Sequence, residues 1–428
     1  MERARLTPPA PGRPRPRARA RARGPVAALL GLGLLAGGLT ALALGDSASA
    51  ATTAALGSNW YASAPYLMPE DNNPPDAAAV MDATGQKAFQ LAFILDGGSC
   101  QPAWGGTSAI STDTTMPAVI QTIRAKGGDV SVSFGGYGGT KLGQTCGTPE
   151  ATAAAYQKAV DKYQLKAVDF DLEEPEYENT AAIHNEIGAA RLLQQNNPGL
   201  YVSITTAGTT SGTGWFGQQM LNEAKSQGFT PNNYSIMPFD GGFASGAAQT
   251  DALVKFNSLL QSTFGWSEAT AYAHEGVSMM NGRTDSAEYF RQADFQTVLD
   301  FATAHGLARY TFWSVNRDRQ CTGAVDPGLS GSCSSVAQGD WDFTKYTVRF
   351  AGATPPSTPP TSSSPTSTIS ATPSSGTCTA AAWDSTKVYT AGNTVSYAGH
   401  RWHAKWWTLN ENPSASGQWG VWADDGPC

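Results

Sequence analysis

Few residues in this 428-residue sequence are of the kinds that bind metal ions or nucleotides. It has five histidines and no C-x-x-C spacing, and the close pair His400 and His403 has no cysteine nearby. Zinc sites usually combine such ligands at short spacings, so none is expected. No G-x-G-x-x-G follows the first predicted strand, which argues against a dinucleotide-binding fold. We predict no metal and no cofactor.

Beyond residue 50 the sequence has no apolar run long enough to span a bilayer. Before it, Val26 to Leu44 is apolar, follows eight arginines between Arg3 and Arg23, and leads to Ala48-Ser49-Ala50. This order is typical of a signal peptide with a small-residue cleavage site. A membrane anchor is the alternative, which the many small residues of the run disfavour. We predict a signal peptide at 1–50 and a secreted, extracellular protein.

Positive charge is scarce once that segment is removed. Its loss takes away eight arginines and two acids, and leaves 20 basic and 33 acidic residues, a formal charge of −13. Such a charge disfavours binding to nucleic acid or to anionic membranes. We therefore expect a neutral substrate and no nucleic-acid or membrane partner for the mature chain.

The six cysteines all follow the predicted signal peptide. An even number in an exported chain indicates disulfides, and six cysteines allow 15 pairings. The sequence cannot select one of these pairings, although proximity and domain boundaries favour Cys100 with Cys146, Cys321 with Cys333, and Cys378 with Cys428.

A composition change divides the rest of the chain. Residues 353–377 contain only proline, serine, threonine, glycine, alanine and one isoleucine, so they cannot bury a core and are typical of an extended linker. A large domain at 51–352 precedes this linker, and a small module at 378–428 follows it.

The large domain alternates β-rich runs with helical segments. Eight strands joined by helices predict an α/β fold, most economically a closed (β/α)8 TIM barrel; an open doubly wound sheet is the alternative. The predicted strands are 61–67, 88–95, 129–134, 167–172, 200–206, 234–239, 276–280 and 308–314, and predicted helices include 115–126, 149–163, 180–196, 215–227 and 286–305.

Six carboxylates crowd the segment after residue 168. Because side chains alternate along a strand, Asp169, Asp171 and Glu173 share one face of 167–172, and the apolar residues between them share the other. In a parallel barrel the acids point inward, and the last of them reaches the C-terminal end, where barrel enzymes keep their chemistry. Crowded buried carboxyls raise one another's pKa, which suits a general acid. Glu174, Glu176 and Glu178 are interpreted as solvated loop residues.

The segment that contains these acids resembles a motif of a known family. V-D-F-D-L-E at 168–173 resembles the core of the D-x-x-D-x-D-x-E signature of glycoside hydrolase family 18, the chitinases and endo-N-acetylglucosaminidases. The segments QLAFIL, CQPAWGG and FWSVNRD look most like its bacterial chitinase D-like branch, and the resemblance covers about 59–350. It implies substrate contacts from an S-x-G-G motif (Ser133, Gly135, Gly136), an M-x-Y-D-like motif (Met237, Phe239, Asp240) and Trp313.

The resemblance also implies a retaining, substrate-assisted mechanism. In it Glu173 protonates the glycosidic oxygen, and the substrate's own 2-acetamido oxygen attacks the anomeric carbon. Asp171 hydrogen-bonds the acetamido N–H, with Asp169 behind it. Two departures stand out: Lys166 replaces the first aspartate of the signature, and Phe239 replaces the tyrosine whose hydroxyl supports the acetamido group in many relatives.

The C-terminal module is dense in tryptophan. AKWWT and its surroundings resemble the chitin- and cellulose-binding modules of carbohydrate-binding families 5 and 12, which predicts a small β-rich C-terminal carbohydrate-binding module. Neighbours on a strand face opposite sides, so one of Trp406 and Trp407 should be exposed to stack on a sugar. We predict these two, with Tyr389 as a weaker third, as chitin-binding residues, and Trp383, Trp402 and Trp422 as core.

Together these features predict a monomeric, secreted chitinase acting on chitin or chito-oligosaccharides. An endo-N-acetylglucosaminidase acting on glycoproteins shares the mechanism, but a chitin-type module argues against it. A non-catalytic chitin-binding lectin is a third possibility, and the presence of Glu173 argues against that.

Overall fold

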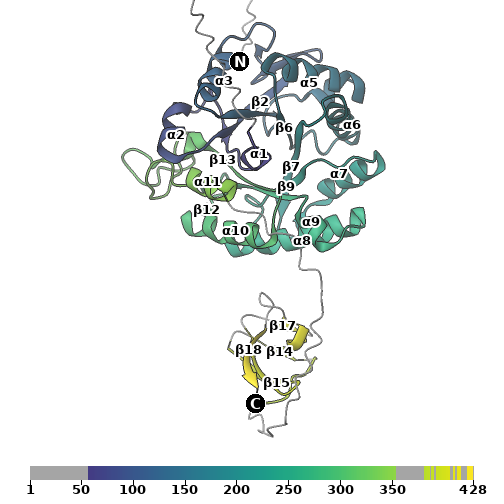
Figure 1. Cartoon of the computed structure of the whole chain (residues 1–428), viewed down its shortest axis with the longest axis vertical. Helices are drawn as coiled ribbons and strands as arrows, with labels where there is room; N and C mark the ends of the chain where they lie inside the picture. The colour runs from purple at the N-terminus through teal and green to yellow at the C-terminus, as the bar shows by residue number, and fades with distance from the viewer. Residues whose placement is uncertain are drawn as a thin grey trace, which may run out of the picture. The chain divides into compact units, whose positions relative to one another are not determined.

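The computed structural model describes residues 56–352 and 380–427, the latter without 386, 390, 391, 405–407, 410, 411 and 416–421. The predicted signal peptide and linker lie outside the described residues, as do Trp406, Trp407, Cys378 and Cys428. The described chain forms a large α/β barrel and a small β-rich module, which we treat separately (Figure 1).

Parallel strands form the barrel, and each pairs with the next strand around it (Figure 1). The ends of this sheet meet where the backbone N–H of Tyr310 donates to the carbonyl oxygen of Ala62 at 3.0 Å. The predicted (β/α)8 barrel is thus confirmed. In order around the barrel the strands are β1 (Tyr66–Leu67), β2 (Ala88–Asp96), β5 (Asp129–Gly135), β6 (Ala167–Leu172), β7 (Tyr201–Thr209), β9 (Asn233–Met237), β10 (Glu275–Met280) and β13 (Arg309–Trp313).

The helices ring this sheet (Figure 1). Two of them have the predicted bounds, because their ends carry strong local signals: Thr148 caps the first with Pro149 at its start, and Asn179 caps the second. The helices of the barrel are α1 (Ser58–Tyr61), α2 (Ala77–Thr84), α3 (Thr115–Ala125), α4 (Leu142–Thr145), α5 (Pro149–Tyr163), α6 (Thr180–Asn196), α7 (Trp215–Ser226), α8 (Gly246–Phe264), α9 (Glu268–Tyr272), α10 (Gln292–His305) and α11 (Thr344–Gly352), with a 3-10 turn η1 (Val315–Arg317).

Two predicted elements differ from the structure. The strand predicted at 61–67 is only two residues long, because 58–61 form α1 instead. The helix predicted at 286–305 begins at Gln292, because residues 282–290 form a hairpin of β11 (Gly282–Arg283) and β12 (Tyr289–Phe290). The short strands β3 (Pro102–Trp104), β4 (Ser108–Ala109) and β8 (Gly212–Thr213) also extend the loops at the C-terminal ends of the strands.

The apolar core lies between the strands and the helices. Val168, Phe170 and Leu172 of β6 are buried on that side, and the Phe170 ring meets Tyr156 of α5 edge-on at 5.2 Å. Burying one such side chain stabilises the fold by about 1.5–3 kcal/mol. The alternation expected for 167–172 is therefore present, and it turns the polar residues of β6 toward the barrel interior.

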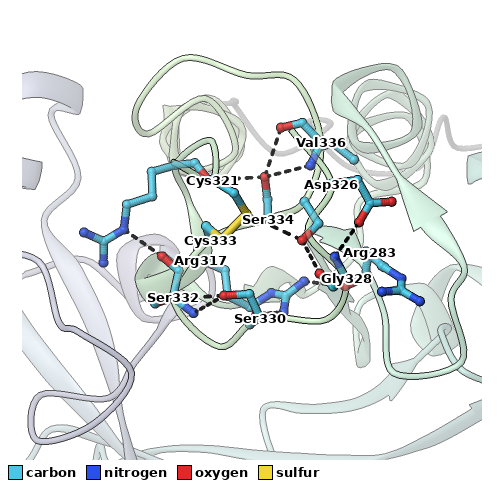
Figure 2. Close-up of a disulfide and its surroundings, with 12 residues drawn as sticks. Arg283, Arg317, Cys321, Asp326, Gly328, Ser330, Ser332, Cys333, Ser334 and Val336 are labelled. Atoms are coloured by element: carbon cyan, nitrogen blue, oxygen red, sulfur yellow. Dashed lines mark hydrogen bonds between the residues drawn. A yellow bond between two sulfur atoms is a disulfide. The ribbon is translucent and has the colours of Figure 1, made fainter. Parts of the chain in front are cut away.

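Two disulfides stabilise loops of the barrel. Cys100 bonds to Cys146 and Cys321 bonds to Cys333, as proximity favoured. The second closes a loop after β13 (Figure 2), where the buried Arg317 guanidinium donates to the carbonyl oxygens of Ser330, Asn281 and Arg283. That arginine therefore joins the disulfide loop to the 282–290 hairpin. In the described parts of the chain, no helix is both long and apolar enough to cross a membrane.

The C-terminal module contains small antiparallel sheets. Its core holds Tyr389, Val395, Trp402 and Trp422. Trp402 and Trp422 are thus core residues as predicted, and Trp383 packs against them. Tyr389 is 9% exposed and packs edge-on against Trp422, so the prediction that it binds chitin is corrected: a ring must expose a face to stack on a sugar. The strands are β14 (Val388–Tyr389), β15 (Thr394–Tyr397), β16 (His400–Ala404), β17 (Thr408–Leu409) and β18 (Trp422–Pro427), with a 3-10 turn η2 (Pro413–Ala415).

Candidate active site

A cavity of about 850 Å³ opens at the C-terminal ends of the barrel strands. Five carboxylate side chains line it, and none of its lining residues is lysine, arginine or histidine. Such a site suits a neutral or cationic ligand better than an anionic one. The residues predicted from the sequence that line it are Asp171, Glu173, Met237, Phe239, Asp240 and Trp313.

The acids of β6 follow the predicted inward row. Asp169 is fully buried in the barrel interior, Asp171 is 2% exposed and lines the cavity, and Glu173 follows the strand at the cavity wall. Every second side chain along this segment therefore points inward, and the three acids extend from the closed interior of the barrel to the open cavity.

Asp169 is the most heavily hydrogen-bonded member of this row. Its Oδ2 accepts from the hydroxyl groups of Tyr66 at 3.0 Å and Ser133 at 2.8 Å and from the Gln90 amide at 3.0 Å. Its Oδ1 accepts from the Thr205 hydroxyl at 2.8 Å and pairs with the buried Arg309 guanidinium at 3.1 Å. The ion pair and the four further donors satisfy both oxygens of this buried carboxylate.

The pKa values of the Asp171 and Glu173 carboxyls are both raised. Burial and then the charges of Glu173 and Asp169 raise the pKa of Asp171 well above its usual range. Burial and then Glu174 raise the pKa of Glu173 to about 7. These two carboxyls therefore keep protons at a higher pH than ordinary carboxyls do.

Gly135 and Gly136 let β5 approach β6 closely at this point. Gly135 has φ +107°, and a Cβ atom there would lie 2.1 Å from the carbonyl oxygen of Asp171. The backbone N–H of Gly136 donates to that same oxygen at 2.8 Å, and a side chain there would meet the Phe93 ring. The glycines of the S-x-G-G motif thus hold the backbone of Asp171, while Ser133 holds Asp169.

Trp313 forms an apolar wall of the cavity. Its indole stacks on the Phe93 ring at 5.5 Å with an interplanar angle of 11°, and it meets Tyr66 edge-on. Its remaining exposed surface faces the cavity, where an indole face can stack on a sugar ring.

The M-x-Y-D-like segment is braced by the 282–290 hairpin. The Glu288 carboxylate accepts from the backbone N–H groups of Asp240, Gly242 and Phe243, each at 2.7 Å. The Asp240 carboxylate in turn accepts from the backbone N–H of Ser286. Asp240 therefore has a structural partner as well as a place in the cavity wall.

The interpretation of Glu176 as a solvated loop residue is wrong. Its side chain is fully buried beside Glu186 of α6, and burial and then this neighbour raise its pKa well above the usual range. The Glu186 carboxylate accepts from the Tyr156 hydroxyl and from the backbone N–H of Gly143, both at 2.6 Å. Burial beside this carboxylate favours the protonated form of Glu176.

Lys141 braces the same loop from the side of β5. Its buried ammonium donates to the carbonyl oxygens of Tyr137 at 3.0 Å and Glu174 at 3.1 Å. Burial lowers its pKa, and the nearby carboxylates of Glu176 and Glu173 oppose that shift.

Several residues at the site were missed from the sequence. Arg309, Gln90 and Ser278 are polar residues inside apolar strand segments, which is a usable signal, whereas Glu176 has no local signal. Within the described residues, no group of three or more histidine, cysteine or acidic side chains is arranged to hold a metal ion.

Comparison with known proteins identifies relatives of both parts. Residues 382–423 match the model of carbohydrate-binding module family 5/12. This chain is 28% identical to a probable bifunctional chitinase/lysozyme of Escherichia coli over 275 residues, which is 60% of the chain. It is 26% identical to endochitinase 11 of Metarhizium anisopliae over 276 residues. These matches span 30% and 52% of the two relatives.

Solved structures agree with this relationship. The catalytic domain of a hyperthermophilic chitinase from Pyrococcus furiosus superposes with a TM-score of 0.62 at 25% identity, over 68% of this chain and 94% of that domain. The predicted resemblance to chitinases is therefore confirmed: the barrel is similar to the catalytic domains of chitinases, which are glycoside hydrolases, and residues 382–423 match the family 5/12 module.

Glu176→Gln should make stability less dependent on pH. The folded wild type keeps a proton on Glu176 that the unfolded chain releases above its ordinary pKa of 4.5, so wild-type stability falls as pH rises beyond it. Each unit of pKa difference corresponds to about 1.4 kcal/mol. The neutral amide removes this loss. Urea unfolding at pH 5 to 8 should therefore show that the free energy of unfolding of the variant rises relative to that of the wild type as the pH increases. Exposed Glu178→Gln is the matched control; a constant difference for Glu176→Gln across this range would refute a buried proton.

Proposed function

We propose that this chain is a secreted chitinase that hydrolyses β-1,4 linkages between N-acetylglucosamine units. The observation that supports it most is the inward row of Asp169, Asp171 and Glu173, which ends at the cavity in a carboxyl with a pKa of about 7. The homologous chitinases and the carbohydrate-binding match point to the same polymer.

The geometry supports a retaining, substrate-assisted reaction. Protonated Glu173 donates its proton to the glycosidic oxygen as the bond to the anomeric carbon breaks. The substrate's acetamido oxygen attacks that carbon and forms an oxazolinium ion, while Asp171 accepts a hydrogen bond from the acetamido N–H. Glu173, now a carboxylate, removes a proton from the incoming water, whose attack opens the ring with net retention. Asp169, paired with Arg309, lies beneath Asp171 and supports it electrostatically.

The substrate would lie against the aromatic wall of the cavity. Trp313 offers an indole face to the sugar whose bond is cleaved, and Met237, Phe239 and Asp240 form the opposing side. Ser133, Gly135 and Gly136 act indirectly, because they hold Asp169 and the backbone of Asp171.

Secretion and the domain division complete the proposal. We assign residues 1–50 to a signal peptide, 51–352 to the catalytic barrel, 353–377 to a linker and 378–428 to a chitin-binding module. Trp406 and Trp407 are the proposed sugar-stacking residues of that module, which would raise the local enzyme concentration on an insoluble polymer.

Glu173→Gln should abolish cleavage of N-acetylglucosamine hexamer. The amide keeps the shape of the side chain but has no acidic proton to give, so we expect kcat to fall at least about 100-fold. Product chromatography and NMR of the first anomer formed measure the outcome; the wild type should release β-anomers.

Glu178→Gln is the matched control, because this exposed carboxyl lies in the same loop. Absence of cleavage by the wild type, with chitin binding intact, would overturn the assignment and direct the test to glycoprotein glycans. Release of α-anomers by the wild type would instead exclude the retaining mechanism.

The pH–rate profile should show the proton on Glu173. Since the acid must be protonated to donate, kcat/KM of the wild type should fall about tenfold per pH unit above a pKa near 7. Initial rates on the hexamer from pH 5 to 9 measure this limb. A descending limb near pH 4.5, where an unperturbed glutamate titrates, would contradict the role of burial.

Deleting 378–428 should separate polymer binding from chemistry. Because no described residue of the module lines the barrel cavity, kcat/KM on the soluble hexamer should stay within about twofold, while binding to insoluble chitin falls at least about tenfold through loss of the tether. A sedimentation assay with chitin beads measures binding. Double substitution of Trp406 and Trp407 by alanine should reproduce the deletion, and unchanged sedimentation would reject them as the binding residues.

A further inference from the structure

Two polar atoms in the cavity wall have no hydrogen-bond partner among the described residues. Several buried side-chain oxygens and nitrogens of the described residues lack a hydrogen bond, and among these only Asp171 Oδ1 and Ser278 Oγ belong to side chains that line the cavity. Leaving a buried polar atom unpaired costs about 1–3 kcal/mol, so such atoms in a binding site indicate where a ligand forms hydrogen bonds.

The position of Ser278 follows from the alternation along β10. Val277 and Met279 belong to the apolar core outside the sheet, so Ser278 points to the barrel interior. Met280, two residues further along the same face, also lines the cavity and pairs with Trp313 of β13. Ser278 therefore lies one step deeper in the cavity than the level of Trp313.

On the other side, β10 adjoins the strand that carries the M-x-Y-D-like segment. Val277 pairs with Ile236 of β9, so Ser278 follows at the level where Met237 enters the cavity wall. Phe239, beyond Met237, lines the same cavity but has no hydroxyl. The hydroxyl group of Tyr66 also faces this region, but it already donates to Asp169.

The two unpaired atoms match the two halves of a secondary amide. An acetamido group has one N–H donor and one carbonyl acceptor. The Asp171 carboxyl oxygen can accept from the first, and the Ser278 hydroxyl can donate to the second. A free amino group or a hydroxyl at the same sugar carbon lacks this carbonyl oxygen and cannot form the same hydrogen bond with Ser278.

We propose that Ser278 is a substrate-contacting residue that hydrogen-bonds the carbonyl oxygen of an N-acetylated sugar and thereby selects for the acetamido group. This assignment rests on the proposed function and goes beyond it, since it names the group that positions the attacking oxygen. The contact holds the acetamido plane so that its oxygen lies under the anomeric carbon.

The test measures binding without cleavage. In a Glu173→Gln background, isothermal titration with N-acetylglucosamine hexamer and with glucosamine hexamer should respond differently to Ser278→Ala. We expect about 5- to 10-fold weaker binding of the acetylated hexamer, the effect of one lost hydrogen bond, and unchanged binding of the deacetylated one. With Glu173 restored, kcat/KM on the acetylated hexamer should fall about 10- to 100-fold.

Thr206→Val is the matched control, because its hydroxyl is also buried and unpaired but lies outside the cavity lining. It should leave both affinities and kcat/KM unchanged. Since the Ser278 hydroxyl has no protein partner, Ser278→Ala should retain the wild-type melting temperature, and Ser278→Cys provides a second variant of similar volume.

The outcomes separate this inference from the function it rests on. If the wild type neither cleaves nor binds the acetylated hexamer, the proposed function fails. If the wild type cleaves it and Ser278→Ala behaves like wild type, or if the variant weakens both hexamers equally, the assignment of Ser278 fails and the chitinase stands.

Discussion

A buried ion pair between Arg309 and Asp169 organises the interior of this barrel. Both side chains are fully buried, and desolvating two charges costs several kcal/mol for each unless hydrogen bonds satisfy the remaining atoms. The structure meets that condition with side chains from strands all around the barrel: Tyr66 (β1), Gln90 (β2), Ser133 (β5), Thr205 (β7) and Ser235 (β9). One polar network therefore ties most of the strands to β6 and fixes a negative charge beneath the cavity.

Burial, followed by neighbouring charges, raises the pKa of the two carboxyls above this ion pair. Asp169 has a cation and several donors, Asp171 has less support, and Glu173 stands at the cavity wall beside Glu174. The carboxyls that lack compensation are the ones with raised pKa values, so protons gather toward the open end of the row. The strand thus carries Asp169, paired with Arg309, at its base and a carboxyl of raised pKa at its open end, and the proposed mechanism depends on this arrangement.

Local patterns predicted the parts of this site that lie within one element. The bounds of β6, α5 and α6, and the inward set of β6, follow from alternation and capping signals over fewer than twenty residues. The partners of Asp169 could not be predicted this way, because Gln90 and Arg309 lie 79 and 140 residues from it along the chain and meet only when the barrel closes. The prediction that Glu176 is solvated was wrong for a related reason. An acid in a loop is normally exposed to solvent, and only the packing of α6 beneath that loop buries this one.

Unpaired buried atoms need different explanations in different parts of the molecule. At Glu176 burial is compatible with a bound proton, because the site is closed and a neutral carboxyl beside Glu186 costs less than a second charge. Adding a proton cannot satisfy Ser278, whose hydroxyl already carries one and still has no acceptor in the protein. Since Ser278 lines the cavity, a ligand bound there can supply the missing hydrogen bond, and the unpaired Asp171 oxygen in the same cavity favours a ligand that offers both a donor and an acceptor. The free-energy cost of burying a polar atom without a hydrogen bond is avoided in most of the fold. It remains at Ser278, where a bound ligand can offset it.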